Sequence, residues 1–108
     1  MDYKFIADLQ SEAVIPQAGI LSRVLQKDDS VNITLFGLAG GEAISSHSAP
    51  TPAILYFLEG EATVQLGDDM THAKPGSFVF MPPMLPHAID AKTPTKMLLV
   101  QVKSKPAN

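Results

Sequence analysis

The sequence predicts an all-β protein, a small sandwich or barrel of seven to ten short strands. Nine prolines and seven glycines interrupt the 108 residues about every seven positions, and the runs between them are rich in β-branched and aromatic residues. The clearest run is EATVQL at 61–66, where Ala62, Val64 and Leu66 alternate with polar residues and so share one face of a strand. A chain of this length is expected to form one domain, residues 1–108.

The other strands are predicted from runs that stop at turn signals. KDDS divides the first hairpin and GDD the second, while Pro82-Pro83 ends a strand because proline has no N–H to donate to a ladder. The expected strands cover 19–26, 31–38, 53–58, 61–66, 70–74, 78–81, 85–92 and 96–103. The first dozen residues fit either a short helix or an extra strand, and the final SKPAN, 104–108, is expected to fray.

Charge and composition exclude several classes of partner. A formal net charge of −3 with scattered basic residues argues against nucleic-acid binding, which needs a clustered basic face. Because the chain has no cysteine, disulfides, thiolate metal sites and cysteine nucleophiles are excluded. No run approaches the roughly 18 apolar residues of a membrane span, so we expect no membrane partner and a cytoplasmic location.

Two of the expected strands are apolar on both faces, AILYFL at 53–58 and MLLV at 97–100. A small sandwich covers only one face of each sheet, so these strands need a second cover. Either the N-terminal segment supplies that cover or a partner subunit does, and the pattern alone leaves both alternatives open.

Two spaced motifs carry a family resemblance. The first places Gly41 six positions before His47, with a distal glycine at Gly60; the second is Gly76-SFVFM-Pro82 followed by Pro86-His87. Their order and separation over about residues 37–91 resemble the two motifs of the cupin superfamily. The resemblance implies a double-stranded β-helix, a jelly-roll barrel with a central pocket. It also implies a homodimer, since small single-domain cupins commonly pair or exchange terminal strands.

The departures from the cupin motifs concern the metal ligands. The resemblance implies three histidines and a glutamate, of which His47 and His87 match the first and last histidine. The second histidine falls on Ala49 and the glutamate on Ala53, so two of four ligands are kept. Met84 replaces a glycine that is usual in the second motif.

Two histidines alone are a poor metal site, since a tightly held transition metal usually has three or more protein ligands. A carboxylate could complete the site, but none is well placed to reach the two histidines. Alternation turns Glu42 and Asp90 to the opposite strand face, and Glu59 and Glu61 are expected at the rim of the barrel. No cofactor is therefore expected. The alternative is a weakly held divalent metal, Fe, Mn, Ni or Zn, on His47 and His87.

The favoured function is the binding of a small organic ligand, with one acidic or carbonyl group, in the barrel pocket. The motifs predict that His47 and His87 lie on facing strands and converge inside the barrel, with Ala49, Ala53 and Ser45 beside them. The plainer interpretation is two core histidines bonded to backbone or hydroxyl groups.

Catalysis is left open, with two enzyme alternatives. One is a metal-dependent cupin enzyme of the dioxygenase or isomerase type, using His47 and His87. The other is metal-free acid–base chemistry on one imidazole, which needs a tuning partner. Tyr56 is not that partner, because alternation turns it away from the face of Leu55 and Phe57.

Other conspicuous side chains have ordinary interpretations. His72 is expected on the surface, in the middle of a hairpin. Arg23 is expected to pack its stem on apolar surface, with an anion clamp at the pocket mouth as the alternative. The three methionines that would suit a soft copper site are expected to fill the core; they are Met81, Met84 and Met97.

Overall fold

The computed structural model describes residues 1–103, which are almost entirely β-structure. Strands account for 53% of these residues and helix for 4%. The elements are α1 (Leu9–Glu12), β1 (Ile20–Lys27), β2 (Val31–Leu38), β3 (Ala43–His47), β4 (Ala53–Glu59), β5 (Ala62–Leu66), β6 (Asp69–Ala73), β7 (Phe78–Met81), β8 (His87–Ala91) and β9 (Thr95–Val102). The expectation for SKPAN lies outside the described residues. Within residues 1–103 no helix has the length and apolar character to cross a membrane.

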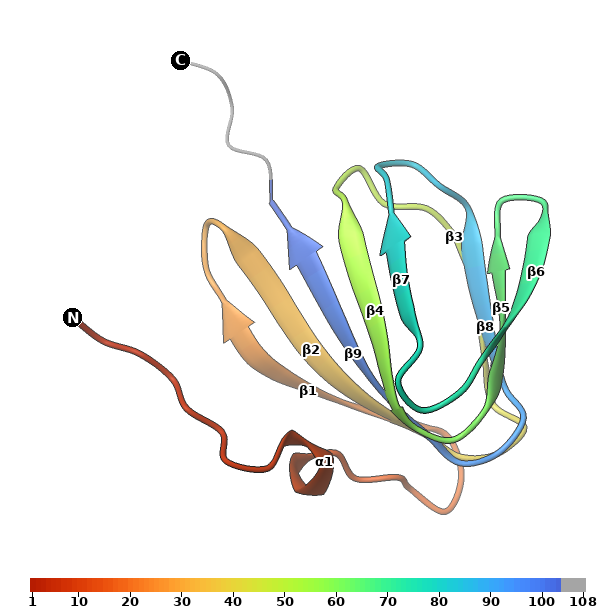
Figure 1. The fold of residues 1–108 in the computed structure, drawn as a ribbon, viewed down its shortest axis with the longest axis horizontal. Helices are drawn as coiled ribbons and strands as arrows, with labels where there is room; N and C mark the ends of the chain where they lie inside the picture. Colours follow the sequence, from red (N-terminus) through yellow and green to blue (C-terminus); the bar gives the residue numbers. More distant parts are fainter. Residues whose placement is uncertain (104–108) are drawn as a thin grey trace.

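The strands form two antiparallel sheets, in the orders β1-β2-β9-β4-β7 and β3-β8-β5-β6. Figure 1 shows the first sheet sweeping from the β1–β2 hairpin to β7, and the second standing beside it. Strand β9 pairs with both β2 and β4, although these strands are distant from it in sequence. Such non-local pairing is typical of a jelly roll. The predicted jelly-roll barrel is confirmed.

The core lies between the two sheets. Leu55 and Phe57 of β4 meet Met97 of β9 on the inner face of the first sheet, and Val64 and Ile89 face them from the second. All five are buried, and each full burial of such a side chain contributes about 1.5–3 kcal/mol. Strand alternation predicts this arrangement, because residues two apart along a strand point to the same side.

The N-terminal segment covers part of the outer face of the first sheet. Its dozen residues contain one helical turn, α1, so the short-helix alternative is confirmed. The carbonyl oxygen of Val14 approaches Gly37 so closely that a Cβ there would lie 1.9 Å from it. Lys96 Nζ donates to the Gln10 carbonyl at 2.9 Å, and Leu35 on this outer face is buried. The chain itself therefore supplies the second cover over β2 and part of β9.

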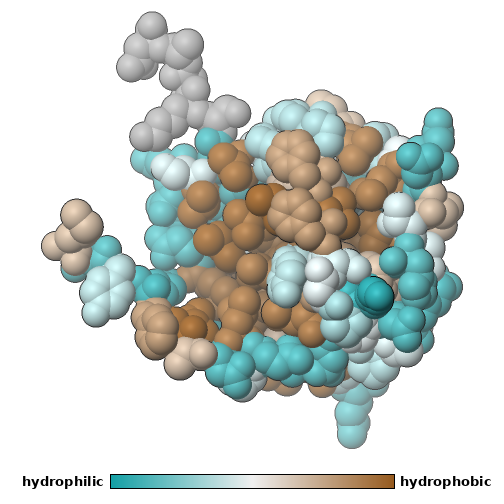
Figure 2. All heavy atoms as spheres, in the orientation of Figure 1, coloured by the Kyte–Doolittle hydropathy of each residue, from teal (hydrophilic) through white to brown (hydrophobic). Residues whose placement is uncertain are grey.

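The outer face of β4 and β7 is left without that cover. Tyr56 pairs in register with Phe78, and Ile54 with Phe80. The exposed fractions of Phe78 and Phe80 are 63% and 59%. Figure 2 shows the apolar side chains gathered across this side of the molecule.

The β1–β2 turn is built around one carboxylate. Asp28 Oδ1 accepts hydrogen bonds from the backbone N–H groups of Ser30 at 2.7 Å and Val31 at 3.0 Å, and Oδ2 accepts from the Gln26 amide at 3.0 Å. The Gln26 bond is the largest of the causes that lower the pKa of Asp28 from 3.8 to about 2, followed by the two backbone bonds.

Because the folded-state pKa of Asp28 is depressed, its ionised form stabilises the fold above about pH 3.8, and this stabilisation is lost as the pH falls towards about 2. We therefore expect Asp28→Asn to lower the melting temperature at pH 7, and the gap to wild type to close between these two pH values. Thermal unfolding across the pH range measures it. Asp29→Asn, which removes a charge from the same turn, is the control, and an identical pH profile for both variants would contradict the interpretation.

Candidate ligand-binding site

A β-bulge brings the two motif histidines together. Strand β3 pairs with β8 at Ile44↔Ile89 and next at His47↔His87, so three steps along β3 match two along β8. His47 therefore comes onto the same face as Ile44, although the two positions have opposite parity. The imidazole centroids are 4.2 Å apart and the ring planes are inclined by 57°.

The bulge corrects two expectations. The histidines converge, but from neighbouring strands of one sheet and not from facing strands. Ser45 was expected beside them because it shares the parity of His47. The extra residue breaks that parity, and Ser45 is exposed and lines no part of the cavity described below.

Both imidazoles are oriented by backbone carbonyls two residues earlier in the chain. His47 Nδ1 lies 2.9 Å from the Ser45 carbonyl oxygen, and His87 Nδ1 lies 3.0 Å from that of Leu85. A carbonyl oxygen only accepts, so each Nδ1 carries the hydrogen. In the neutral ring each Nε2 then presents a lone pair, and within residues 1–103 neither Nε2 has a hydrogen-bond partner.

The histidines line two neighbouring pockets, called here the smaller and the larger compartment. The smaller, about 70 Å³, is lined by His47, Ala49, Thr51, Ala53, Met81, Pro82, Leu85, His87, Leu99 and Gln101. The larger, about 240 Å³, is lined by Ile20, Phe36, Ile44, His47, Leu55, His87, Ile89, Met97 and Leu99. Both compartments share the two imidazoles and Leu99. In the larger one every other lining residue is apolar, so the imidazoles are its polar groups.

The sequence interpretation missed most of this lining. Gln101 and Leu99 lie on the inner face of β9 with Met97, and Thr51 precedes β4. The sequence does contain the information that would have placed them. Residues 97, 99 and 101 of KMLLVQVK alternate onto one face of a strand, so a core position for Met97 puts Leu99 and Gln101 on the inner face as well. Met81, expected in the core, is buried and also lines the smaller compartment.

The four acidic residues considered as metal ligands are engaged elsewhere. Glu61 Oε1 contacts His72 Nε2 at 2.8 Å, and Asp90 pairs with Lys92 at 3.2 Å. Glu59 accepts from the Gln10 amide at 3.1 Å, and Glu42 accepts from a backbone N–H at 3.1 Å. None of them lines either compartment.

The residues present do not fit a tightly held metal. Within residues 1–103 no three His, Cys, Asp or Glu side chains come together at a point. Ala49 and Ala53 line the smaller compartment with the histidines, and their methyl groups donate nothing to a metal. The Gln101 amide oxygen already accepts from Asn32 Nδ2 at 3.2 Å. Two imidazole nitrogens fall short of the three ligands such sites usually have.

Met84, at the position where the cupin motif usually has glycine, has a backbone conformation that glycine favours. Its φ is 68°, in the left-handed region, which costs a residue with a Cβ about 1–2 kcal/mol. The turn is held by the Met84 N–H, which donates to the Ala49 carbonyl at 2.7 Å. Met84 is exposed, so its expected place in the core is wrong, because the left-handed turn directs its side chain to solvent.

The remaining candidates lie away from the cavity. His72 is exposed on the second sheet, as expected. Arg23 pairs with Glu12 of α1 on the outer face of β1 and lines neither compartment, so the anion-clamp alternative has no support. Tyr56 is on the outer face of β4, as alternation predicts.

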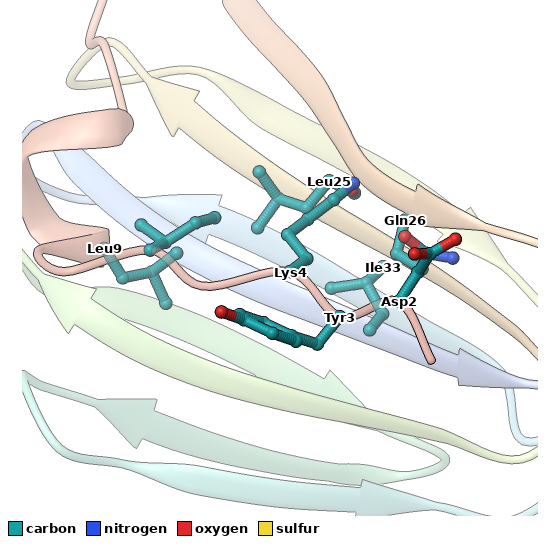
Figure 3. Close-up of a pocket in the computed structure, with 8 residues that line it drawn as sticks. Asp2, Tyr3, Lys4, Leu9, Leu25, Gln26 and Ile33 are labelled. Atoms are coloured by element: carbon teal, nitrogen blue, oxygen red, sulfur yellow. The ribbon is translucent and has the colours of Figure 1, made fainter.

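A larger hollow lies elsewhere, beneath the N-terminal segment. It measures about 550 Å³ and lies between that segment and the β1–β2 hairpin. Figure 3 shows Tyr3, Lys4 and Leu9 of the segment beside Leu25 and Ile33 of the strands. Its walls include exposed residues of an extended arm and contain no histidine, so we place the candidate site at the paired imidazoles instead.

Comparison with known proteins assigns the family. The family model of the cupin domain matches residues 34–102, a range that contains both motifs and the paired histidines. The chain belongs to the cupin family. Cupins carry many functions on one fold, so membership alone assigns no activity.

Solved structures extend this cupin similarity to nearly the whole chain. A conserved protein of unknown function from Streptococcus pyogenes is 33% identical, with 98% of this chain and 93% of that chain covered and a TM-score of 0.87. A cupin superfamily protein from Desulfitobacterium hafniense is 27% identical, with 96% and 95% covered and a TM-score of 0.87. No curated protein matches the chain.

The tautomers of this cupin's histidines are directly testable. At about pH 8 we expect long-range ¹H–¹⁵N NMR spectra to show hydrogen on Nδ1 and none on Nε2 for both His47 and His87. His72 is the internal control: its Nε2 faces the Glu61 carboxylate, so it takes the opposite tautomer. Either cavity histidine showing the His72 pattern would contradict the assigned hydrogen bonds.

Proposed function

We propose that this cupin binds a small organic ligand between its sheets and holds no metal tightly. The observation that carries the proposal is the pair of imidazoles, each with an uncommitted Nε2, on the wall of an otherwise apolar cavity. Such a cavity combines few oriented polar groups with an apolar lining, which is the usual make-up of small-molecule sites. The cysteine-free composition accords with a cytoplasmic location, which is part of the proposal.

Hydrogen bonding explains why the cavity favours an occupant. His87 is buried and His47 is exposed, and neither Nε2 is a buried atom without a partner. A ligand group that bonds to an Nε2 therefore replaces water, and such an exchange contributes about 0.5–1.5 kcal/mol. An organic ligand gains more than water, since its apolar part also covers Phe36, Ile44 and Leu99, which the protein itself buries only partly.

The alternative is a metal-dependent enzyme of the dioxygenase or isomerase type. The observation in its favour is that two imidazole rings 4.2 Å apart line one small space, and that each has an uncommitted Nε2. Water or substrate oxygens would have to supply the other ligands, which makes the metal easy to remove with a chelator.

Metal retention and probe binding separate the two functions. We expect wild-type protein dialysed against EDTA to retain much less than one equivalent of transition metal by elemental analysis. We expect it still to bind 4-methylphenol or its isomer anisole in NMR titrations, with shifts at His47 and His87. At least one of His47→Ala and His87→Ala should weaken the binding of 4-methylphenol by roughly tenfold.

His72→Ala is the matched control, since it removes an imidazole from the outer surface and should leave binding unchanged. One equivalent of metal that survives dialysis in wild type and is lost in both cavity variants would establish the enzyme alternative. Failure of both probes to bind would also overturn the ligand-binding proposal.

We also propose that the protein is a homodimer, joined through the outer face of β4 and β7. Tyr56, Phe78 and Phe80 form an exposed apolar cluster there. In a two-fold symmetric contact the same patch of both subunits meets. A charged patch would then bring like charges together, whereas this cluster is uncharged and avoids that repulsion. The apolar pattern of AILYFL that needed a cover is the same face.

Sedimentation at micromolar concentration measures the assembly, and we expect a species of twice the 11.6 kDa chain mass. Phe80→Glu should shift it to the monomer, because a charge would be buried in the contact. Met70→Glu is the control: Met70 is equally exposed and apolar but lies on the second sheet. A wild-type monomer, or dissociation by both variants alike, would contradict the proposed interface.

A further inference from the structure

We infer that the ligand is a neutral hydrogen-bond donor, an alcohol, phenol or N–H compound with a compact ring-sized body, and not an acceptor-only carbonyl compound. The inference rests on the proposed binding function and adds the polarity and size of the ligand. It reverses the polarity suggested by the motifs alone, where an acidic or carbonyl group was expected.

The backbone fixes the polarity of the site. Each Nδ1–H is already donated, to the Ser45 carbonyl by His47 and to the Leu85 carbonyl by His87. Turning either ring to point an N–H at the cavity would break its bond to that carbonyl. The neutral rings therefore offer two acceptors and no donor to a ligand.

The polypeptide around the rings resists such a turn. The Gly67 N–H donates to the Pro86 carbonyl at 2.8 Å, and the Met84 N–H donates to the Ala49 carbonyl at 2.7 Å. These bonds tie the segment before His87 to β5 and to the chain that follows His47. The carbonyl of Leu85, between Met84 and Pro86, is thereby held in place.

Two adjacent acceptors select among ligand groups. A ketone or ether oxygen has no hydrogen to donate, so it leaves the Nε2 of His47 and that of His87 without a ligand partner. A hydroxyl or N–H group donates to one nitrogen and satisfies it. The imidazoles shared by the two compartments place this donor where the compartments meet.

The larger compartment sets the size and charge of the ligand body. About 240 Å³ exceeds the about 150 Å³ of a cavity that holds benzene, so one six-membered ring with a small substituent fits. No charged side chain lines either compartment. A charged body would be desolvated there without a counter-ion, which disfavours it strongly.

Matched probe pairs test the inference on the full chain after dialysis against EDTA. 4-Methylphenol and anisole are isomers that differ in having a donor hydrogen, and cyclohexanol and cyclohexanone form a second pair. We expect each donor to bind about tenfold more tightly than its partner in NMR titrations. The Nε2 signal of His47 or His87 should shift on binding of the donors and not of the acceptors.

Variants assign the preference to the imidazoles. In the double variant His47→Leu/His87→Leu the affinities of each pair should converge, while His72→Ala should keep the tenfold preference. If the double variant does not fold, the Nε2 shifts in wild type give the same answer. Equal or tighter binding of anisole and cyclohexanone would overturn the inference and leave the proposed function standing. No binding by any of the four compounds would overturn both.

Discussion

The pairing of His47 with His87 across β3 and β8 is the interaction on which the rest of the site depends. The bulge between Ile44 and His47 turns an outward position inward and sets two imidazoles 4.2 Å apart. Backbone carbonyls then fix both rings, so that their free nitrogens are acceptors. The bulge therefore determines where the polar groups of the cavity lie and why Ser45 is not among them. The polarity proposed for the ligand also depends on it.

The chain retains the frame of a cupin metal site while its chemistry differs. The left-handed turn persists at Met84, where the side chain makes that conformation costly, and its N–H still bonds to the chain after His47. At Ala49 and Ala53 methyl groups line the wall where the family pattern places ligands.

Much of the fold could be predicted from sequence, because the β signals are local. Proline, glycine and alternation located eight of the nine strands within a few residues, and the paired motifs indicated their jelly-roll arrangement. Strand β3 was indicated only by the motif that puts His47 on a strand, because its sequence AISSH has no β pattern of its own. The site was less predictable: a bulge depends on how β3 meets β8, and counting parity along one strand placed Ser45 wrongly. Gln101 was missed because its role depends on packing across sheets.

The central claim is that the two imidazoles face each other inside the cavity, and ring-to-ring nuclear Overhauser effects test it most directly. With ring centroids 4.2 Å apart, the carbon-bound ring protons of His47 and His87 should give clear cross-peaks in the ligand-free protein. The cross-peaks should extend to methyl groups of Ile44 and Ile89, which pair beside the histidines. Assigned ring protons without any mutual cross-peak would contradict the bulge, the paired histidines and the site built on them.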